Sequence, residues 1–157
     1  VLRHARALLA SGAPGTIDYV DADLRDTGAI LRAAARTLDF GRPVAIMLIA
    51  VMHLITDADD PYGIVAALKD AMAPGSHLVL SQVAADIEPE RMAEGARRYN
   101  HLARETQRHR TLEEVSRFFG GLDLVAPGVV PVQRWRPSSE LEAGAKSAMW
   151  CGVARHR

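Results

Sequence analysis

The amino-acid sequence predicts an α/β fold in which a Rossmann-like, doubly wound, mostly parallel sheet ends in an antiparallel hairpin. Three observations support this prediction. Helical and extended segments alternate over residues 16–81, with short connections between them. The run at residues 44–51 is apolar at both parities, as is typical of a central parallel strand covered on both faces. Two late extended segments have no helix between them long enough for a crossover, so we expect them to pair antiparallel.

The composition is that of one globular domain. The chain has 157 residues, of which 48% are apolar and 24% charged, enough to bury a core. Basic and acidic residues both number 19, and this balance argues against a nucleic-acid or anionic-membrane surface. A single cysteine, Cys151, excludes an internal disulfide and fits a cytoplasmic protein. The longest apolar run spans about a dozen residues where a membrane helix needs roughly 20, so no membrane span is predicted.

The first fifteen residues resemble the end of a helix that begins elsewhere. Apolar residues recur at helical spacing directly from the first positions, at Leu2, Ala5, Leu8 and Leu9. The sequence SGAPG at residues 11–15 then ends the helix. The chain begins with Val1, without a cap or the apolar core of a signal peptide. We therefore expect an N-terminally truncated chain.

A strand and a helix are expected between residues 16 and 38. Residues 16–20 alternate β-branched and aromatic side chains, which predicts a short strand. An aspartate-rich stretch follows, and Asp26 is a suitable N-cap. The predicted helix covers residues 27–38 and places its apolar side chains on one stripe, namely Ile30, Leu31, Ala34 and Leu38.

The next three elements are a buried strand, a helix and a second buried strand. The first strand is the apolar run at residues 44–51, which follows the chain-breaking sequence GRP. Asp60 and Pro61 then form a typical helix start, with the aspartate as N-cap and the proline in the first turn. This helix is expected to reach Met72, and residues 77–81 form the second strand.

The last part of the chain has a different pattern. A polar helix is predicted at residues 88–107 and a second helix at residues 111–119, whose inward side chains are Leu112, Val115, Phe118 and Phe119. The two late strands are expected at residues 122–132 and 147–154.

Four stretches of sequence resemble one family of class I methyltransferases. YVDADLRD at residues 19–26 resembles the end of the third strand of that fold, and AIMLIAVMHLITD at residues 45–57 resembles the fourth strand and its exit loop. MAPGSHLVLS resembles the turn before the fifth strand. With HRTLEEVSRFFGGLDLVAPGVVPVQRWRP at residues 109–137, the chain is similar to the actinobacterial S-adenosyl methyltransferase family, long catalogued as a domain of unknown function. The resemblance covers essentially all 157 residues.

The resemblance implies an enzyme that uses S-adenosyl-L-methionine to methylate an unidentified, small-molecule acceptor. Residues 1–157 would then be the C-terminal part of one methyltransferase domain, with residues 87–110 as a helical insertion or lid. Members of the family begin with a strand, a glycine-rich turn and a second strand with an acidic end. The resemblance implies that these first strands and the turn are missing from residues 1–157 and lie upstream. Two alternatives remain. One is a nicotinamide-dependent oxidoreductase, against which the terminal hairpin and the polar insertion argue. The other is a non-catalytic binding or regulatory module, which only the upstream sequence would distinguish from an enzyme.

The resemblance also implies a cofactor site at the carboxyl ends of the strands. The carboxylate of Asp23 would accept a hydrogen bond from the adenine amino group, while the Leu24 N–H donates to a ring nitrogen. Ala50, Val51 and His53 would complete the cofactor-binding set. Asp21 and Ala22 could take the adenine role instead if the strand ends earlier. The alternative to any adenine contact is that Asp21, Asp23 or Asp26 merely caps the following helix, a role that Asp26 fits best.

His53 has three possible roles. It follows the predicted central strand and could line the pocket, or bind the loop backbone as a structural histidine. With an ordinary pKa near 6.5 it is also a weak candidate for a catalytic proton acceptor. Methyl transfer requires mainly alignment of the reactants, so the sequence need not contain an obvious catalytic dyad.

Other polar residues are given simpler roles. Asp57, Asp59 and Asp60 lack the spacing of a calcium loop and are expected to cap helices, so no metal is predicted. Six arginines and two glutamates lie between residues 91 and 110, which fits either a lid over an acidic substrate or a solvated helix. One face of this helix would hold Arg97, His101, Arg104 and Arg108, and another the apolar residues Met92, Ala96, Tyr99 and Ala103.

Two late side chains complete the candidates. Trp135 could be a platform near the pocket, although such a residue more often packs against the edge of a late strand. Cys151 lies among apolar residues in a predicted strand and is expected in the core, not as a nucleophile.

Overall fold

The computed structural model describes residues 16–103 and 106–157, so the helix expected over residues 1–10 lies outside the described part. The strands are β1 (Ala45–Leu48), β2 (His77–Val83), β3 (Asp123–Leu124), β4 (Val130–Pro131) and β5 (Met149–Arg155). The α-helices are α2 (Thr27–Ala34), α3 (Pro61–Asp70), α4 (Pro89–Leu102), α5 (Leu112–Arg117) and α6 (Glu140–Ala143). Three single 3₁₀ turns are η1 (Met52–Leu54), η2 (Asp57–Asp59) and η3 (Val132–Arg134).

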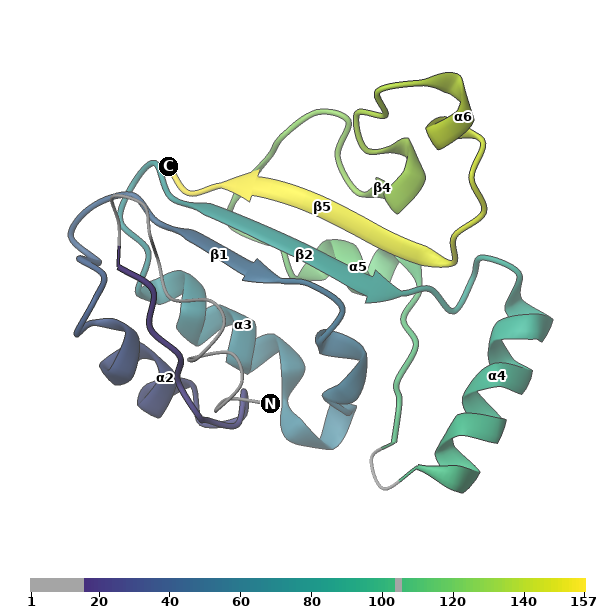
Figure 1. Ribbon diagram of the computed structural model, residues 1–157, viewed down its shortest axis with the longest axis horizontal. Coiled ribbons are helices and arrows are strands. Elements are labelled where there is room, and N and C mark those ends of the chain that lie inside the picture. Colours follow the sequence, from purple (N-terminus) through teal and green to yellow (C-terminus); the bar gives the residue numbers. More distant parts are fainter. Residues whose placement is uncertain (1–15, 104–105) are drawn as a thin grey trace.

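The sheet combines parallel and antiparallel pairs in the order β1-β2-β5-β3 (Figure 1). β1 and β2 are parallel, with Ala45 opposite His77. β5 lies antiparallel to β2 along the whole of that strand, and β3 and β4 pair antiparallel with the other edge of β5. The predicted antiparallel end of the sheet is therefore confirmed.

One face of the sheet carries the core. Leu48, Leu78 and Leu80 point from neighbouring strands into one buried cluster. Helices α3 and α5 close this cluster, mainly through Val65, Leu68, Val115, Phe118 and the adjoining Phe119. Burial of these side chains is the main driving force that holds the two helices to the sheet.

The other face of β1 is open within the described residues. Met47 and Ile49 are 63% and 51% exposed, because they alternate with the buried Leu48 along the strand. The prediction that this apolar run is covered on both faces is therefore wrong for the described part of the chain. On this second face, the segment that contains β4 and η3 covers β5. It does not extend over β1, which therefore stays uncovered by the residues that the structure describes.

The predicted helix starts are confirmed by their caps. The Asp26 carboxylate accepts from the Ala29 N–H at 2.9 Å, and the Asp60 carboxylate accepts from the Gly63 N–H at 3.0 Å. Thr111 and Glu114 form a capping box at the start of α5. The ends of α2 and α3 come earlier than predicted, at Ala34 and Asp70.

Three predicted elements differ from the structure. Residues 16–20 are extended but do not form a strand, because they have no ladder partner among the described residues. The strand expected over residues 122–132 is divided into β3 and β4 by a turn in which Gly128 has a φ of +90°. The polar helix ends at Leu102, because Ala103 has extended backbone angles. Within the described ranges, no helix combines the length and the apolar character needed to cross a membrane.

Gly152 in β5 provides a test of the core packing. A Cβ atom at this position would lie 2.9 Å from Phe119 Cζ and 3.2 Å from Val129 Cγ2. We expect Gly152→Ala to lower the free energy of unfolding by about 1–3 kcal/mol, because the neighbouring side chains must move. Urea unfolding measures this change.

Gly95→Ala is the matched control, since no atom lies within 4 Å of the position a Cβ would take in α4. Alanine favours helix, so this variant should leave the free energy of unfolding unchanged or raise it by up to about 1 kcal/mol. Equal stability of Gly152→Ala and the unchanged protein would contradict the packing described for β5.

Candidate functional site

Two loop segments meet at the carboxyl end of β1. The first is residues 21–25, which precede α2; the second is the exit turn, defined here as residues 50–57, which follows β1 and includes η1. In open α/β sheets, ligands bind in the crevice outside the carboxyl ends of parallel strands. The predicted cofactor residues are all on these two segments, and this edge is therefore the candidate site.

Arg25 links the two segments. Its Nε donates to Asp59 Oδ1 at 2.9 Å, and its Nη2 donates to the Leu54 carbonyl at 3.3 Å. On its other side, Nη1 lies 3.2 Å from the Asp23 carboxylate. Sequence reasoning missed Arg25, because only the fold brings Asp59, two residues beyond the exit turn, to the same guanidinium as Asp23.

Asp23 is held by Arg25 but remains accessible. Its Oδ1 accepts from the Arg25 backbone N–H at 2.9 Å, and this bond, with the Arg25 guanidinium, holds the pKa of Asp23 below its usual range. The side chain is still 58% exposed. Asp23 does not cap α2, since Asp26 does so, and Leu24 next to it packs against the core.

The exit turn begins with a left-handed residue. Ala50 has a φ of +50°, and its N–H donates to the buried Ser81 Oγ at 2.9 Å. This bond joins the ends of β1 and β2 and turns the chain across the edge of the sheet. Val51 follows, half-buried against the core. A non-glycine residue in this conformation is uncommon and costs roughly 1 kcal/mol or more, so the surrounding structure must fix it.

His53 lies half-buried in η1. Its Nδ1 is buried and has no hydrogen-bond partner among the described residues, so it is not a histidine that binds the loop backbone there. Burial lowers the pKa of His53, and the positive charge of Arg110 lowers it further. His109 lies close enough that the two imidazoles interact, and its pKa is also lowered, first by burial.

Arg110 is completely buried and holds the exit turn from below. Its Nη1 donates to the Met52 carbonyl at 2.9 Å, and its Nη2 donates to the Ile55 carbonyl at 2.8 Å. The backbone of Arg110 meanwhile bridges to the end of β2, where its N–H donates to the Val83 carbonyl at 3.1 Å. Sequence reasoning counted Arg110 only as one of six arginines in the stretch 91–110 and missed this role.

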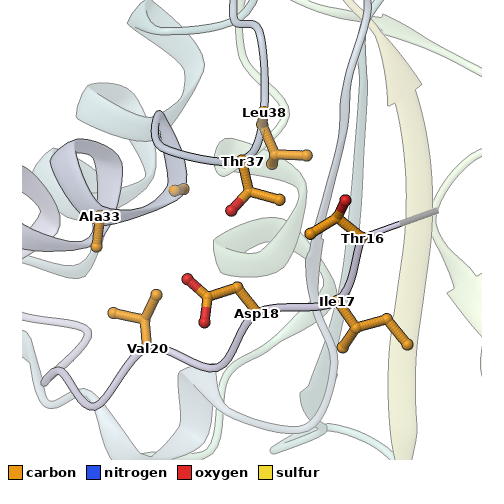
Figure 2. A pocket seen from close by; sticks show the side chains of 8 residues that line it. Thr16, Ile17, Asp18, Val20, Ala33, Thr37 and Leu38 are labelled. Carbon is orange, nitrogen blue, oxygen red and sulfur yellow. The ribbon is translucent and has the colours of Figure 1, made fainter. Parts of the chain in front are cut away.

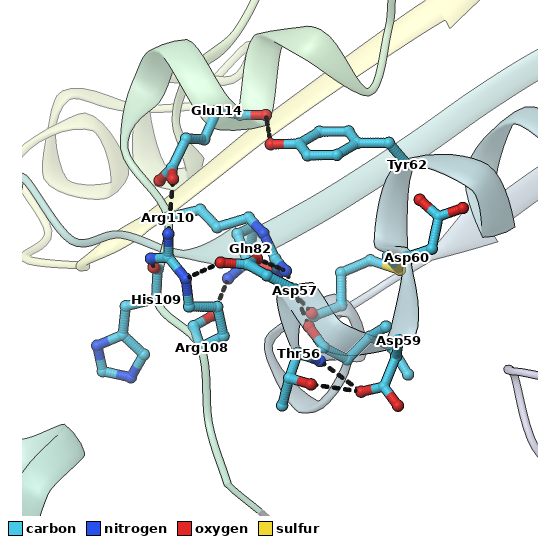
Figure 3. Close-up of polar contacts among 12 residues, drawn as sticks. Thr56, Asp57, Asp59, Asp60, Tyr62, Gln82, Arg108, His109, Arg110 and Glu114 are labelled. Carbon is cyan, nitrogen blue, oxygen red and sulfur yellow. Dashed lines mark hydrogen bonds and ion pairs between the residues drawn. The ribbon is translucent and has the colours of Figure 1, made fainter.

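Arg108 and Arg110 converge on Asp57 (Figure 3). Arg108 Nε donates to Asp57 Oδ2 at 2.9 Å, and Arg110 Nη2 donates to Asp57 Oδ1 at 3.1 Å. Arg108 also binds Glu114 Oε1 at 2.6 Å. These contacts lower the pKa of Asp57, with the Arg108 hydrogen bond as the largest cause.

Three aspartates at the end of the exit turn and just after it, Asp57, Asp59 and Asp60, therefore have different roles. The prediction of helix capping is confirmed for Asp60 and for Asp59, which forms a capping box with Thr56 and whose pKa falls to about 2, first through Arg25. It is wrong for Asp57, which pairs with arginines instead. In the described part of the chain, no group of three or more histidine, cysteine or acidic side chains is placed to hold a metal ion.

Helix α4 is solvated on all sides. None of its residues is buried, and Arg91, Arg97 and Arg98 pair with Glu88 or Glu94 of the same helical region. The predicted basic face is wrong in one respect, because Arg108 lies beyond the helix end and turns toward Asp57. Arg104, also predicted on that face, lies outside the described residues.

Two cavities lie away from the exit turn. One of about 300 Å³ lies between residues 16–20 and the end of α2, where Asp18 and Thr37 point into the same space (Figure 2). None of the predicted cofactor residues lines it. A second, apolar cavity of about 190 Å³ lies on the open face of the sheet and includes Ile49, Trp135 and Cys151. Cys151 is buried, as predicted, and burial raises the pKa of its thiol.

Comparison with solved structures shows close similarity to two actinobacterial proteins. A DUF574 family protein from Streptomyces avermitilis is 38% identical with a TM-score of 0.92, over 99% of this chain and 61% of that one. A proposed methyltransferase from Thermobifida fusca is 36% identical with a TM-score of 0.86, over 100% of this chain and 59% of that one. The present chain thus spans about three-fifths of the length of these relatives.

More distant similarity agrees with the predicted fold. A SAM-dependent methyltransferase from Methanosarcina mazei has 12% identity and a TM-score of 0.59, which shows a shared fold alone. A search of curated proteins found no match. The sequence model of the S-adenosyl methyltransferase family matches residues 1–157, the whole chain. The chain therefore belongs to the S-adenosyl methyltransferase family.

Proposed function

We propose that this chain contributes the adenine side and the acceptor side of an S-adenosyl-L-methionine-dependent methyltransferase that acts on a small molecule. The observation that carries this proposal is the family match over all 157 residues, joined to a site at the strand ends where that fold binds ligands. The family match favours methyl transfer over the hydride transfer considered from the sequence. Because the relatives are longer, the activity is proposed for the whole protein.

Asp23, Leu24, Ala50, Val51 and His53 are the residues we assign to the cofactor. Asp23 suits the adenine amino group, because its carboxylate is exposed and Arg25 fixes its direction without covering it. The bound cofactor would supply a methyl carbon already activated by a sulfonium sulfur. The protein has then to align the acceptor and exclude water, for which a rigid exit turn is well suited.

The charges of the described surface support a small-molecule acceptor. Arginines of α4 that a nucleic acid could contact are paired with glutamates of the same region, and the whole chain has no net charge. Helix α4 stands apart from the sheet, beyond the carboxyl ends of β1 and β2 (Figure 1). We assign residues 87–110 to one wall or lid of the acceptor pocket. We also propose that the protein is cytoplasmic.

Asp23→Ala tests the adenine assignment. In a protein of the relatives' full length, this variant should bind S-adenosyl-L-methionine roughly fivefold more weakly, as expected for the loss of one hydrogen bond. Isothermal titration calorimetry measures the dissociation constant. Asp26→Ala is the matched control: it removes the N-cap of α2, three residues away, and should lower thermal stability without changing affinity. Unchanged affinity in Asp23→Ala would refute the assignment.

The 157-residue chain alone should bind the cofactor poorly. Micromolar affinity corresponds to roughly 8 kcal/mol, whereas the described residues offer only a few hydrogen bonds of about 1 kcal/mol each. We expect no detectable calorimetric binding below millimolar concentrations for this chain and clear binding by a protein of the relatives' full length. Submillimolar binding by the chain alone would contradict this expectation.

A further inference from the structure

The exit turn is fixed to other segments mainly through its backbone carbonyls. Four successive carbonyls, of residues 52–55, accept hydrogen bonds from other segments. The Arg110 guanidinium donates to the carbonyls of residues 52 and 55, at 2.9 and 2.8 Å. The Arg108 backbone N–H donates to the His53 carbonyl at 2.7 Å, and the Arg25 guanidinium donates to the Leu54 carbonyl at 3.3 Å. His53 lies within this set, with both of its neighbours held in the same way.

Arg110 has the geometry to control this turn. Its guanidinium is the only fully buried charged side chain in the described chain, and its fork spans two carbonyls three residues apart. The planar guanidinium directs separate N–H groups at the two carbonyls in a fixed geometry, whereas a lysine would offer one compact ammonium on a flexible stem. The exposed carboxylate of Asp57 balances the charge of the Arg110 guanidinium. The centroid of the Phe118 ring lies 5.6 Å from Arg110 Cζ.

We propose that Arg110 is a positioning residue: by fixing the exit turn through its carbonyls, it presents His53 to the methyl acceptor as a neutral proton acceptor. This inference rests on the proposed methyl transfer and narrows the acceptor to one with an O–H or N–H group. The acceptor's oxygen or nitrogen would form a bond to the methyl carbon while the bond between this carbon and the sulfonium sulfur breaks. The electron pair of the broken bond stays on the sulfur. The acceptor's proton moves to the ring nitrogen of His53 that carries no hydrogen, and water takes it afterwards.

The electrostatic surroundings favour the neutral imidazole. Among the described residues, Arg110 is the charge that lowers the pKa of His53, and the charge of His53 in turn lowers the pKa of His109. Asp57 and Arg108 lie one contact further away. Burial and the Arg110 charge both lower the pKa of His53. The imidazole is therefore unprotonated near neutral pH, the form that can accept a proton.

NMR titration of the His53 ring in the full chain tests the proposal without cofactor or acceptor. The signal is assigned by its loss in His53→Gln. Arg110→Gln removes the positive charge and should raise the pKa of His53 by roughly half a unit or more. Asp57→Asn removes the charge that balances Arg110 and should lower this pKa. Arg97→Gln, which loses an arginine that is exposed and pairs with Glu94, is the control and should leave it unchanged.

Arg110→Lys separates position from charge. It keeps the positive charge but loses the fork, so the pKa of His53 should stay low while the amides of Leu54 and Ile55 exchange roughly tenfold faster. If Arg110→Gln does not fold, Arg110→Lys and Asp57→Asn decide the question. An unchanged His53 pKa in Asp57→Asn, or unchanged exchange in Arg110→Lys, would overturn the proposal. A protein that shows these shifts but does not bind S-adenosyl-L-methionine would refute the proposed function alone.

Discussion

The exit turn after β1 depends on one buried guanidinium. Removing the charge of Arg110 from water costs several kcal/mol, and this cost is offset only while the carbonyls of the turn and the Asp57 carboxylate surround it. The backbone of Arg110 is at the same time anchored beside the end of β2. The end of β1, the end of β2 and the connection into α5 are therefore formed together, and the candidate site inherits its rigidity from this arrangement.

Arg25 reaches the same turn from the opposite side. It binds the Leu54 carbonyl between the two carbonyls that Arg110 binds, and its other contacts are Asp23 and Asp59. Asp23, the candidate adenine contact, is thus bound through Arg25 to the exit turn. His53, the candidate proton acceptor, lies in this turn, which Arg110 also holds. Proximity of this kind is what methyl transfer requires, because correct alignment of the reactants supplies most of the rate.

The elements governed by local signals could be predicted from the sequence. Asp26, Asp60 and Thr111 mark helix starts by their own side chains, and the apolar run that contains Leu48 identifies the buried strand. The exact ends of helices could not be predicted, since Ala103 leaves the helix without a glycine or a proline to mark the position.

The site itself was predictable only in part. Resemblance directed attention to Asp23 and His53, but the contacts that hold the exit turn join residues 29 to 58 positions apart in the sequence. They include Arg25 with Leu54, Ala50 with Ser81 and Arg110 with Met52. Arginine spacing in a polar stretch is typical of a solvated helix, and nothing local marks Arg110 as buried. Long-range pairing of this kind becomes visible only when the strand ends are placed side by side.

Hydrogen exchange measured by mass spectrometry on a protein of the relatives' full length tests whether the cofactor binds at the strand-end edge. With S-adenosylhomocysteine added, we expect slower exchange in peptides that cover residues 21–25 and 50–57, and unchanged exchange in α6. Protection confined to regions outside these two segments would contradict the assignment of the strand-end edge as the cofactor site.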